Sequence, residues 1–348
     1  MYKKIVEFRP SISSENIGDH IIQLYITDLM NELFGDHLTV SMPRRSYLTK
    51  RNLKHVNTSD YSFVCGTNLL ASNMDKRHQW NLRKGDMFRL HDVILLGVGW
   101  RQYQKNPNLY TEMLLKNVLN PNVLHSVRDG YTEKMLKAAG IENVINTGCP
   151  TMWKLTGEVV DKIPTYKGKA VITTLTNYMQ NDEQNHFIMD MLLSNYEMVY
   201  VWLQAIEDYE QLRRMGYEDK VYIIPPTLKA YSSVLENLDD VDYVGTRLHG
   251  GIHALNKGRR SLIIAVDNRA VEISRDTGLP VIKRENVKQE LEHMICDSWK
   301  TEIVLPLENI EKWKKQFKLE TLEFREGGYK LITCSSMRRL ICTEEACA

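Results

Sequence analysis

The chain has 348 residues, a length that predicts about two domains at roughly 150 residues each. Its 45 Lys and Arg residues nearly balance 44 Asp and Glu residues, which argues against the cationic composition of a nucleic-acid-binding protein. Hydrophobic residues make up 43% of the chain, enough for a sizeable core and too many for a disordered polyelectrolyte. We therefore expect a folded protein with no nucleic-acid partner.

The sequence carries no sign of a membrane span or a secretory signal. No apolar run approaches the ~18–20 residues that a bilayer-spanning helix needs. The first ten residues include Lys3, Lys4, Glu7 and Arg9 in place of an apolar signal core. The six cysteines form no Cys-x-x-Cys pair, which indicates reduced thiols rather than a zinc or redox motif. These features predict a cytoplasmic protein whose membrane contact is at most peripheral.

Short apolar runs alternate with amphipathic helical patterns in the first half of the chain. A strand is expected at residues 5–8, and apolar residues then recur at helical spacing over residues 21–34. Gly35 is the expected helix stop. The other elements expected here are strands at 61–65, 92–98 and 123–127 and a helix at 131–139.

A polar, Pro- and Gly-punctuated stretch at residues 148–169 marks the expected domain boundary. The alternation then resumes, with strands expected at 170–175, 198–203, 221–224, 243–245 and 261–266. An amphipathic helix over 309–320 and a short strand over 329–333 follow.

This alternation is typical of βαβ units and parallel sheets. It predicts an α/β fold with two Rossmann-like, doubly wound domains that face a cleft. The N-terminal domain is expected over residues 1–160, the C-terminal domain over 161–325 and a tail over 326–348. Because ligands bind at the carboxyl ends of the strands in such sheets, the loops after the strands are the candidate functional segments.

The most informative of these loops follows the strand at 243–245. Arg247 is suited to hold a carboxylate or phosphate with two parallel hydrogen bonds. His249 titrates near neutral pH and is suited to proton transfer. Gly250 and Gly251 open a helix whose first N–H groups favour an anion. The alternative is structural: Arg247 pairs with an acid, and His249 caps the helix.

A metal site in this helix is disfavoured. His249 and His253 stand four residues apart, but Gly250 occupies the place where a zincin helix needs Glu, and no third ligand is evident. We expect no metal and no cofactor, and we expect His253 to be buried.

Three other loops carry polar groups with two interpretations each. Asn16 or Asp19 either caps the first helix or contacts a ligand that approaches Gly18. The Arg128-Asp129 pair either fixes a turn as a local ion pair, which we favour, or contacts substrate. Residues 267–269 either bind a ligand or form a solvated cap.

Two further patterns bear on ligands. The glycines at 97 and 99 lack the third glycine of a dinucleotide fingerprint. Aromatic residues suited to stack on a sugar, for which core packing is the alternative, are Trp100, Tyr103, Trp153, Tyr178 and Trp202.

Taken together, these segments resemble the polysaccharide pyruvyl transferase family. The resemblance rests on Asn-Ile-Gly-Asp at 16–19, Ser-Val-Arg-Asp at 126–129 and above all Thr-Arg-Leu-His-Gly at 246–250. It implies a glycosyltransferase-B-like pair of domains. It also implies transfer of the pyruvyl unit of phosphoenolpyruvate onto a sugar of a polysaccharide or lipid-linked precursor, which gives a pyruvate ketal and phosphate during cell-envelope polysaccharide synthesis.

The resemblance also implies roles for individual residues. Arg247 and His249 are the expected catalytic residues. Donor binding is expected at Arg247, Leu248, His249, Gly250, Gly251, Thr176, Asn268 and Arg269. Acceptor binding is expected at Asn16, Gly18, Asp19, Thr67, Asn68 and Arg128.

The chain departs from the family pattern in the second domain. Family members often have an arginine where this chain has Thr176, and a tyrosine and lysine where it has residues 267–269. Two alternative functions therefore stay open. One is a nucleotide-sugar glycosyltransferase on the same scaffold, and the other is a non-catalytic homologue in polysaccharide assembly.

Overall fold

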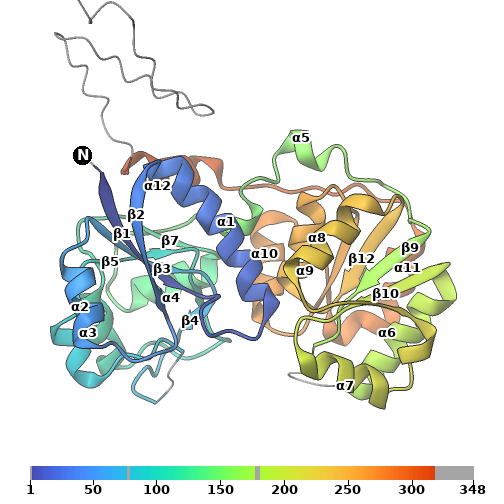
Figure 1. Cartoon of the computed structure of the whole chain (residues 1–348), viewed down its shortest axis with the longest axis horizontal. Helices are drawn as coiled ribbons and strands as arrows, with labels where there is room; N and C mark the ends of the chain where they lie inside the picture. The colour runs from blue at the N-terminus through green and yellow to red at the C-terminus, as the bar shows by residue number, and fades with distance from the viewer. Residues whose placement is uncertain (1, 77–78, 177–180, 318–348) are drawn as a thin grey trace, which may run out of the picture.

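The computed structural model describes residues 2–76, 79–176 and 181–317. Two domains lie side by side, each built on a parallel sheet flanked by helices (Figure 1). A cleft lies between them. This arrangement confirms the predicted α/β fold class with two Rossmann-like domains that face a cleft.

The first sheet has the strand order β2-β1-β3-β5, all parallel. The parallel pair β7-β8 extends it, because the Gly97 N–H beyond β5 donates to the Ser126 carbonyl in β7 at 3.0 Å. The order reverses between β1 and β3, which makes their carboxyl ends a switch point where doubly wound sheets bind ligands. The elements of this half are β1 (Lys3–Arg9), α1 (Ile17–Phe34), β2 (His37–Pro43), α2 (Lys50–Asn57), β3 (Tyr61–Cys65), β4 (Asn68–Leu70), η1 (Lys84–Phe88), β5 (Val93–Leu96), β6 (Gly99–Trp100), α3 (Leu109–Val118), β7 (His125–Val127), α4 (Gly130–Ala138), β8 (Val144–Asn146), η2 (Pro150–Met152) and α5 (Gly157–Val160).

The second sheet has the order β11-β10-β9-β12-β13-β14, also parallel throughout. Its switch point lies between β9 and β12, so the loops after these two strands meet at one edge. The elements of this half are β9 (Ala170–Thr173), α6 (Asp182–Asn195), β10 (Met198–Trp202), α7 (Ile206–Arg214), η3 (Glu218–Lys220), β11 (Tyr222–Ile224), α8 (Leu228–Asn237), β12 (Val241–Gly245), α9 (Leu248–Asn256), β13 (Ser261–Ala265), α10 (Asn268–Thr277), β14 (Val281–Lys283), η4 (Arg284–Asn286), α11 (Val287–Cys296) and α12 (Leu307–Lys315).

Helix α1 is buried on two sides and belongs to both cores. Ile22 and Ile26 pack into the core beneath the first sheet. Ile21 and Tyr25 pack into the core of the second domain. The Tyr25 hydroxyl also lies 3.0 Å from Nδ1 of His253 in α9, so a polar contact joins the domains inside this apolar interface.

Helix α12 follows the second domain in the chain but packs against the first sheet (Figure 1). Trp313 is fully buried, and its ring lies 6.2 Å from that of Phe63 and 4.8 Å from that of Phe317. The last described segment therefore contributes to the first domain's core.

The strands and helices predicted within the described residues have counterparts in the structure, but several observed elements were not predicted, among them β2, α2, α3, β8, β14 and α11. Strand β2 and helix α2 were not predicted, because β2 is an edge strand with mostly half-exposed side chains and α2 is short and strongly charged. The predicted strand at 329–333 lies outside the described residues.

The predicted aromatic sugar-binding surface is wrong for two of its members. Trp100 and Trp202 are fully buried core residues, and Trp202 stacks on Tyr231 at a ring distance of 3.7 Å. Trp153 packs against Trp313. Tyr103 is exposed and donates to Glu272 of α10, and Tyr178 lies outside the described residues.

We expect Trp313→Ala to destabilise the protein by about 3–5 kcal/mol, because it leaves a large cavity under the first sheet. The shift of the first urea-unfolding transition measures this loss. Leu307→Ala, at an exposed position of the same helix, is the matched control and should change stability by no more than about 0.5 kcal/mol. Equal effects of the two changes would contradict the packing role of α12.

Candidate active site

The two switch points face each other across a cleft of about 670 Å³. Loops after β1 and β3 contribute to one wall, and the loops after β10, β12 and β13 form the other. The lining residues are Ser13, Glu15, Asn16, Asp19, Arg44, Arg45, Thr67, Asn68, Gln79, Arg101, Gln102, Ala205, Glu207, Arg247, Asp267 and Arg269. Five arginines therefore reach this cleft.

Arg247 lies between the end of β12 and the start of α9. Its Nη2 atom donates to both carboxylate oxygens of Asp208, at 2.9 and 3.2 Å. Asp208 also accepts the backbone N–H groups of Gln204 and Ala205 at the start of α7. The structural alternative for Arg247, pairing with an acid, is thus confirmed, although the side chain still lines the cleft.

His249 lies in the first turn of α9 and is 7% exposed. Its Nε2 atom is 3.8 Å from Sγ of Cys149, which belongs to the segment before η2. Burial lowers the pKa of His249 to about 3, and the positive charges of Arg269 and Arg128 add to this effect. The imidazole is therefore neutral near pH 7 in the free protein.

Gly250 and Gly251 let α9 approach the second sheet. A Cβ atom at Gly250 would lie 3.0 Å from the Tyr243 hydroxyl, and one at Gly251 would lie 2.6 Å from Cγ1 of Ile263. Leu248 is part of the same core. These contacts give all three residues a packing role, and donor contact through their backbone stays a prediction.

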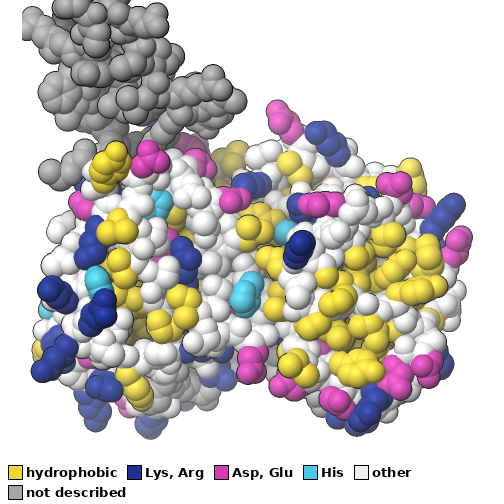
Figure 2. Space-filling view, viewed as in Figure 1, with side chains coloured by type: hydrophobic (Ala, Val, Ile, Leu, Met, Phe, Trp, Pro, Cys, Tyr) yellow, Lys and Arg dark blue, Asp and Glu magenta, His cyan; other side chains and the backbone are white. Residues whose placement is uncertain are grey.

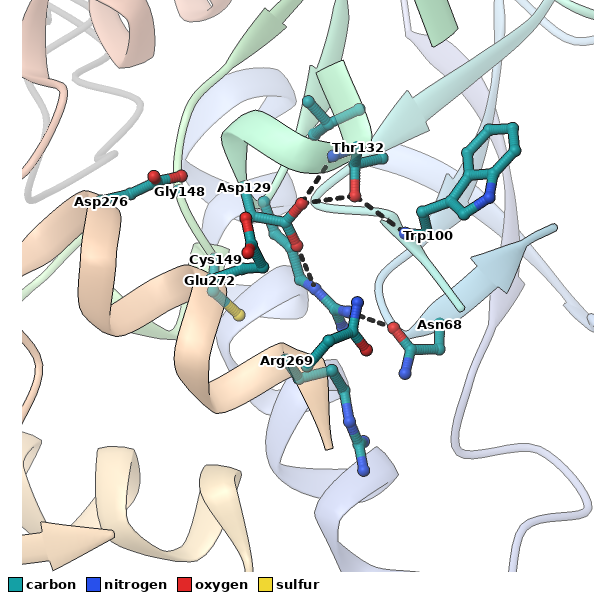
Figure 3. A network of polar contacts seen from close by, with 12 residues as sticks. Asn68, Trp100, Asp129, Thr132, Gly148, Cys149, Arg269, Glu272 and Asp276 are labelled. Carbon is teal, nitrogen blue, oxygen red and sulfur yellow. Dashed lines mark hydrogen bonds and ion pairs between the residues drawn. The ribbon is translucent and has the colours of Figure 1, made fainter. Parts of the chain in front are cut away.

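Arg128 is buried behind the first-domain wall. Its Nε atom donates to Asp129 at 3.1 Å, and its Nη2 atom donates to Oδ1 of Asn68, which lines the cleft. Asp129 caps α4 by accepting from the Thr132 N–H at 2.7 Å, and the Thr132 hydroxyl oxygen accepts from the Trp100 N–H (Figure 3). The predicted local ion pair is confirmed.

Gly99 is required by the position of Arg128. A Cβ atom at Gly99 would lie 2.2 Å from the guanidinium carbon of Arg128. The glycine at this position thus gives room to a buried cation.

Residues 267–269 form the start of α10. Asp267 caps this helix by accepting the Arg269 N–H, and its carboxylate also binds the Arg269 side chain at 2.6–2.9 Å. The Oδ1 atom of Asn268 accepts the Gln102 N–H from the first domain at 3.2 Å. Both Asp267 and Arg269 line the cleft.

The first-domain wall is built on the start of α1 and the end of β3. Asn16 caps α1 by accepting the Gly18 N–H at 3.0 Å. Asp19 accepts from the Ser14 hydroxyl and pairs with the buried Arg44 at 3.3 Å. Thr67 has a φ of +64°, and its buried hydroxyl has no hydrogen-bond partner among the described residues.

The sequence profile of one family, described as polysaccharide pyruvyl transferase, matches residues 16–268. The chain belongs to this family. The matched range covers most of the residues that line the cleft, and of that lining Ser13, Glu15 and Arg269 lie outside it.

Several solved structures are similar to the chain at low identity. Escherichia coli heptosyltransferase WaaC with ADP-2-deoxy-2-fluoro heptose is 12% identical, with 83% of this chain and 99% of that chain covered and a TM-score of 0.37. The lipopolysaccharide outer core galactosyltransferase WaaB is 8% identical, with 85% and 90% covered and a TM-score of 0.43. A UDP-N-acetylglucosamine 2-epimerase is 12% identical, with 90% of each chain covered and a TM-score of 0.41. No curated protein matches the sequence.

The cleft contains residues that the sequence patterns did not single out. Arg44 and Arg45 follow β2, a strand that was not predicted. Arg101 follows the predicted strand at 92–98 closely, so its place in a loop after a strand was visible in the sequence. Asp208 lies far before Arg247 in the chain, and no local motif connects the two.

Thr176 is 1% exposed and is not one of the residues that line the cleft. The sequence expectation of donor contact at this position stays a prediction. Within the described ranges, no three His, Cys, Asp or Glu side chains gather as a metal site would require. Nor does any described helix have the length and apolar character needed to cross a bilayer.

Three buried histidines should make stability depend on pH. Burial lowers the pKa of His125 and His253 to about 4 and that of His249 to about 3. The unfolded chain therefore binds protons first, so stability present above about pH 6.5 is lost as pH falls, by about 1 kcal/mol per pH unit for each histidine.

Urea unfolding at several pH values measures this dependence. His253→Gln removes one titrating group and should make the loss of stability less steep. His293→Ala, at an exposed position, is the control and should leave the slope unchanged. A stability that stays constant down to about pH 5 would contradict the depressed pKa values.

Proposed function

We propose that this family member transfers the pyruvyl unit of phosphoenolpyruvate onto a sugar of a polysaccharide or lipid-linked glycan precursor, forming a ketal and releasing phosphate on the cytoplasmic side. The observation that carries the proposal is the arginine-lined cleft between two switch points, with a buried histidine beside it. Family membership supplies the reaction class.

The cleft suits a small, multiply charged anion. Phosphoenolpyruvate carries a phosphate and a carboxylate, and guanidinium groups bind both with paired hydrogen bonds. Arg247 and Arg269 project from the second domain, and each is held by a neighbouring carboxylate on its own side. Their orientation is thus fixed before the donor arrives, which reduces the entropic cost of binding.

His249 is the proposed proton donor, and we expect it to take up a proton from solvent when phosphoenolpyruvate binds. Burial keeps the pKa of His249 low in the free protein, and the positive charges of Arg269 and Arg128 lower it further. An anion bound beside these arginines offsets their charge and favours the imidazolium. The proton then becomes available only when phosphoenolpyruvate is present.

The reaction follows in balanced steps. The His249 proton passes to the methylene carbon, which becomes the methyl group, and C2 becomes electrophilic. One sugar hydroxyl oxygen bonds to C2, and its proton passes to His249, which restores the imidazolium. The C2–O bond to phosphate breaks, and a second hydroxyl of the same sugar closes the ketal as its proton passes to the released phosphate. Arg247 stabilises charge on the departing phosphate more than on the bound ester.

The acceptor binds on the first-domain wall in this proposal. Asn16, Asp19, Thr67 and Asn68 present amide, carboxylate and hydroxyl groups to the cleft, which are groups that sugar hydroxyls bind. Arg128 acts from behind this wall by holding Asn68 in place.

Replacing His249 tests its role directly. We expect His249→Ala to lower kcat for phosphate release by about 10²–10⁴-fold with a small change in donor KM, because it removes a general acid. Phosphate release from phosphoenolpyruvate with a crude glycan acceptor is the measurement. His293→Ala is the control. A His249→Ala variant with near-native kcat would exclude the proposed role.

Donor binding should be coupled to proton uptake. Titration of the protein with phosphoenolpyruvate near pH 7, by calorimetry in buffers of different ionisation enthalpy, is expected to show uptake of up to one proton. His249→Gln should bind the donor without this uptake. If the wild type binds phosphoenolpyruvate without proton uptake, the proposed protonation of His249 is wrong. If nucleotide sugars and not phosphoenolpyruvate raise Tm, a donor of another class occupies the cleft.

A further inference from the structure

One surface of the first domain is strongly cationic although the chain as a whole is nearly neutral. Residues 44–59 contain five Lys and Arg residues and no Asp or Glu. Lys84 and Arg89 lie in and just after η1, and the one acid of that segment, Asp86, is buried. We call the exposed cations Lys50, Arg51, Lys54, Lys84 and Arg89 the basic ridge. Lysine and arginine side chains gather over α2 in Figure 2.

The basic ridge is not neutralised by the protein itself. None of its five side chains forms an ion pair with any residue that the structure describes. Elsewhere on the surface exposed lysines do pair, as Lys137 does with Glu133 at 2.6 Å and Lys154 with Asp28 at 2.7 Å. The ridge therefore presents uncompensated positive charge to an anionic partner.

An exposed aromatic ring lies within this charge. Phe88 is 67% exposed at the end of η1. It lines a groove of about 540 Å³ together with Lys50, Lys54 and Arg89. An apolar ring surrounded by cations is unfavourable in water but matches a bilayer interface, where the ring enters the acyl boundary and the cations contact headgroup phosphates.

We propose that the basic ridge and Phe88 form a docking surface for an anionic phospholipid bilayer. Each lysine or arginine at such a surface adds to the attraction, so several cations together give reversible, salt-sensitive binding. A soluble polyanion uses the charges but gives Phe88 no apolar partner, which is why the bilayer is the favoured occupant.

A short stretch of chain joins the ridge to the cleft wall. Arg44 and Arg45 line the cleft, and the loop that follows them leads directly into α2. If the acceptor is a lipid-linked glycan, a relation that rests on the proposed function, the bilayer would present it beside the first-domain wall. Docking itself does not depend on the reaction.

Sedimentation of the full chain with vesicles tests the proposal. Wild-type protein is expected to bind vesicles of phosphatidylglycerol and phosphatidylcholine, to lose binding as salt rises, and to ignore vesicles of phosphatidylcholine alone. The triple variant Lys50→Gln, Lys54→Gln, Arg89→Gln should lower the affinity by roughly a hundredfold. Phe88→Ser should lower it separately at constant charge.

The matched control removes three exposed cations from the second domain: Arg213→Gln, Lys229→Gln and Lys288→Gln. It should bind vesicles nearly as the wild type does. Equal losses in both triple variants, or no wild-type binding, overturn the proposal. The proposal is also overturned if heparin binding depends on the ridge cations while Phe88→Ser leaves vesicle binding unchanged. That result would identify a soluble polyanion as the partner.

Two readouts separate this test from the proposed reaction. Unchanged Tm values show that the exposed substitutions leave the fold intact. Phosphate release with a soluble acceptor should be the same for the ridge variants and the wild type. Ridge variants that lose vesicle binding but still release phosphate support docking. A wild-type protein that binds vesicles but releases no phosphate contradicts the proposed reaction and leaves docking intact.

Discussion

The geometry of the cleft depends on one helix that has to satisfy two hydrophobic cores. Ile22 and Ile26 of α1 pack under the first sheet, while Ile21 and Tyr25 pack into the second domain. A helix with apolar side chains on both sides cannot leave either domain without exposing one of them to water. The N-terminus of this helix, capped by Asn16, lies at the cleft, so the packing that joins the domains also positions the first-domain wall.

Paired charged side chains line or adjoin both walls of the cleft. Arg247 and Arg269 each have a carboxylate partner on their own domain, and Arg128 is held between Asp129 and Asn68. Such pairing offsets much of the cost of removing a guanidinium from water and fixes its direction. His249 is buried beside these groups, which lowers its pKa, and the positive charges of Arg269 and Arg128 lower it further. In the proposed reaction, a donor anion bound to Arg269 therefore favours the protonated form of His249.

Much of this architecture could be predicted from the sequence, because it is encoded locally. Alternating apolar runs and helical periods predicted the two parallel sheets, and the segment around Arg247 and His249 was placed at a strand end, where the structure has it. Features that depend on distant residues could not be predicted in this way. The Arg247–Asp208 pair, the contact of Cys149 with His249 and the role of Gly99 beside Arg128 arise only when separate segments fold together. Buried tryptophans were also ambiguous, since an isolated aromatic residue carries no sign of which side of a sheet it faces.

The return of α12 to the first sheet affects the order in which the molecule can be assembled. Trp313 and Phe317 complete a core whose other members, such as Ile5 and Phe63, emerge from the ribosome much earlier. Domains usually fold as units in the order of their synthesis. Here the core of the domain made first lacks Trp313 and Phe317 until the residues just after α12 have been translated. The apolar side chains that these two residues cover therefore stay exposed in the nascent chain until then. A chain that terminates before Trp313 would have a first domain with an exposed apolar surface, to which chaperones bind.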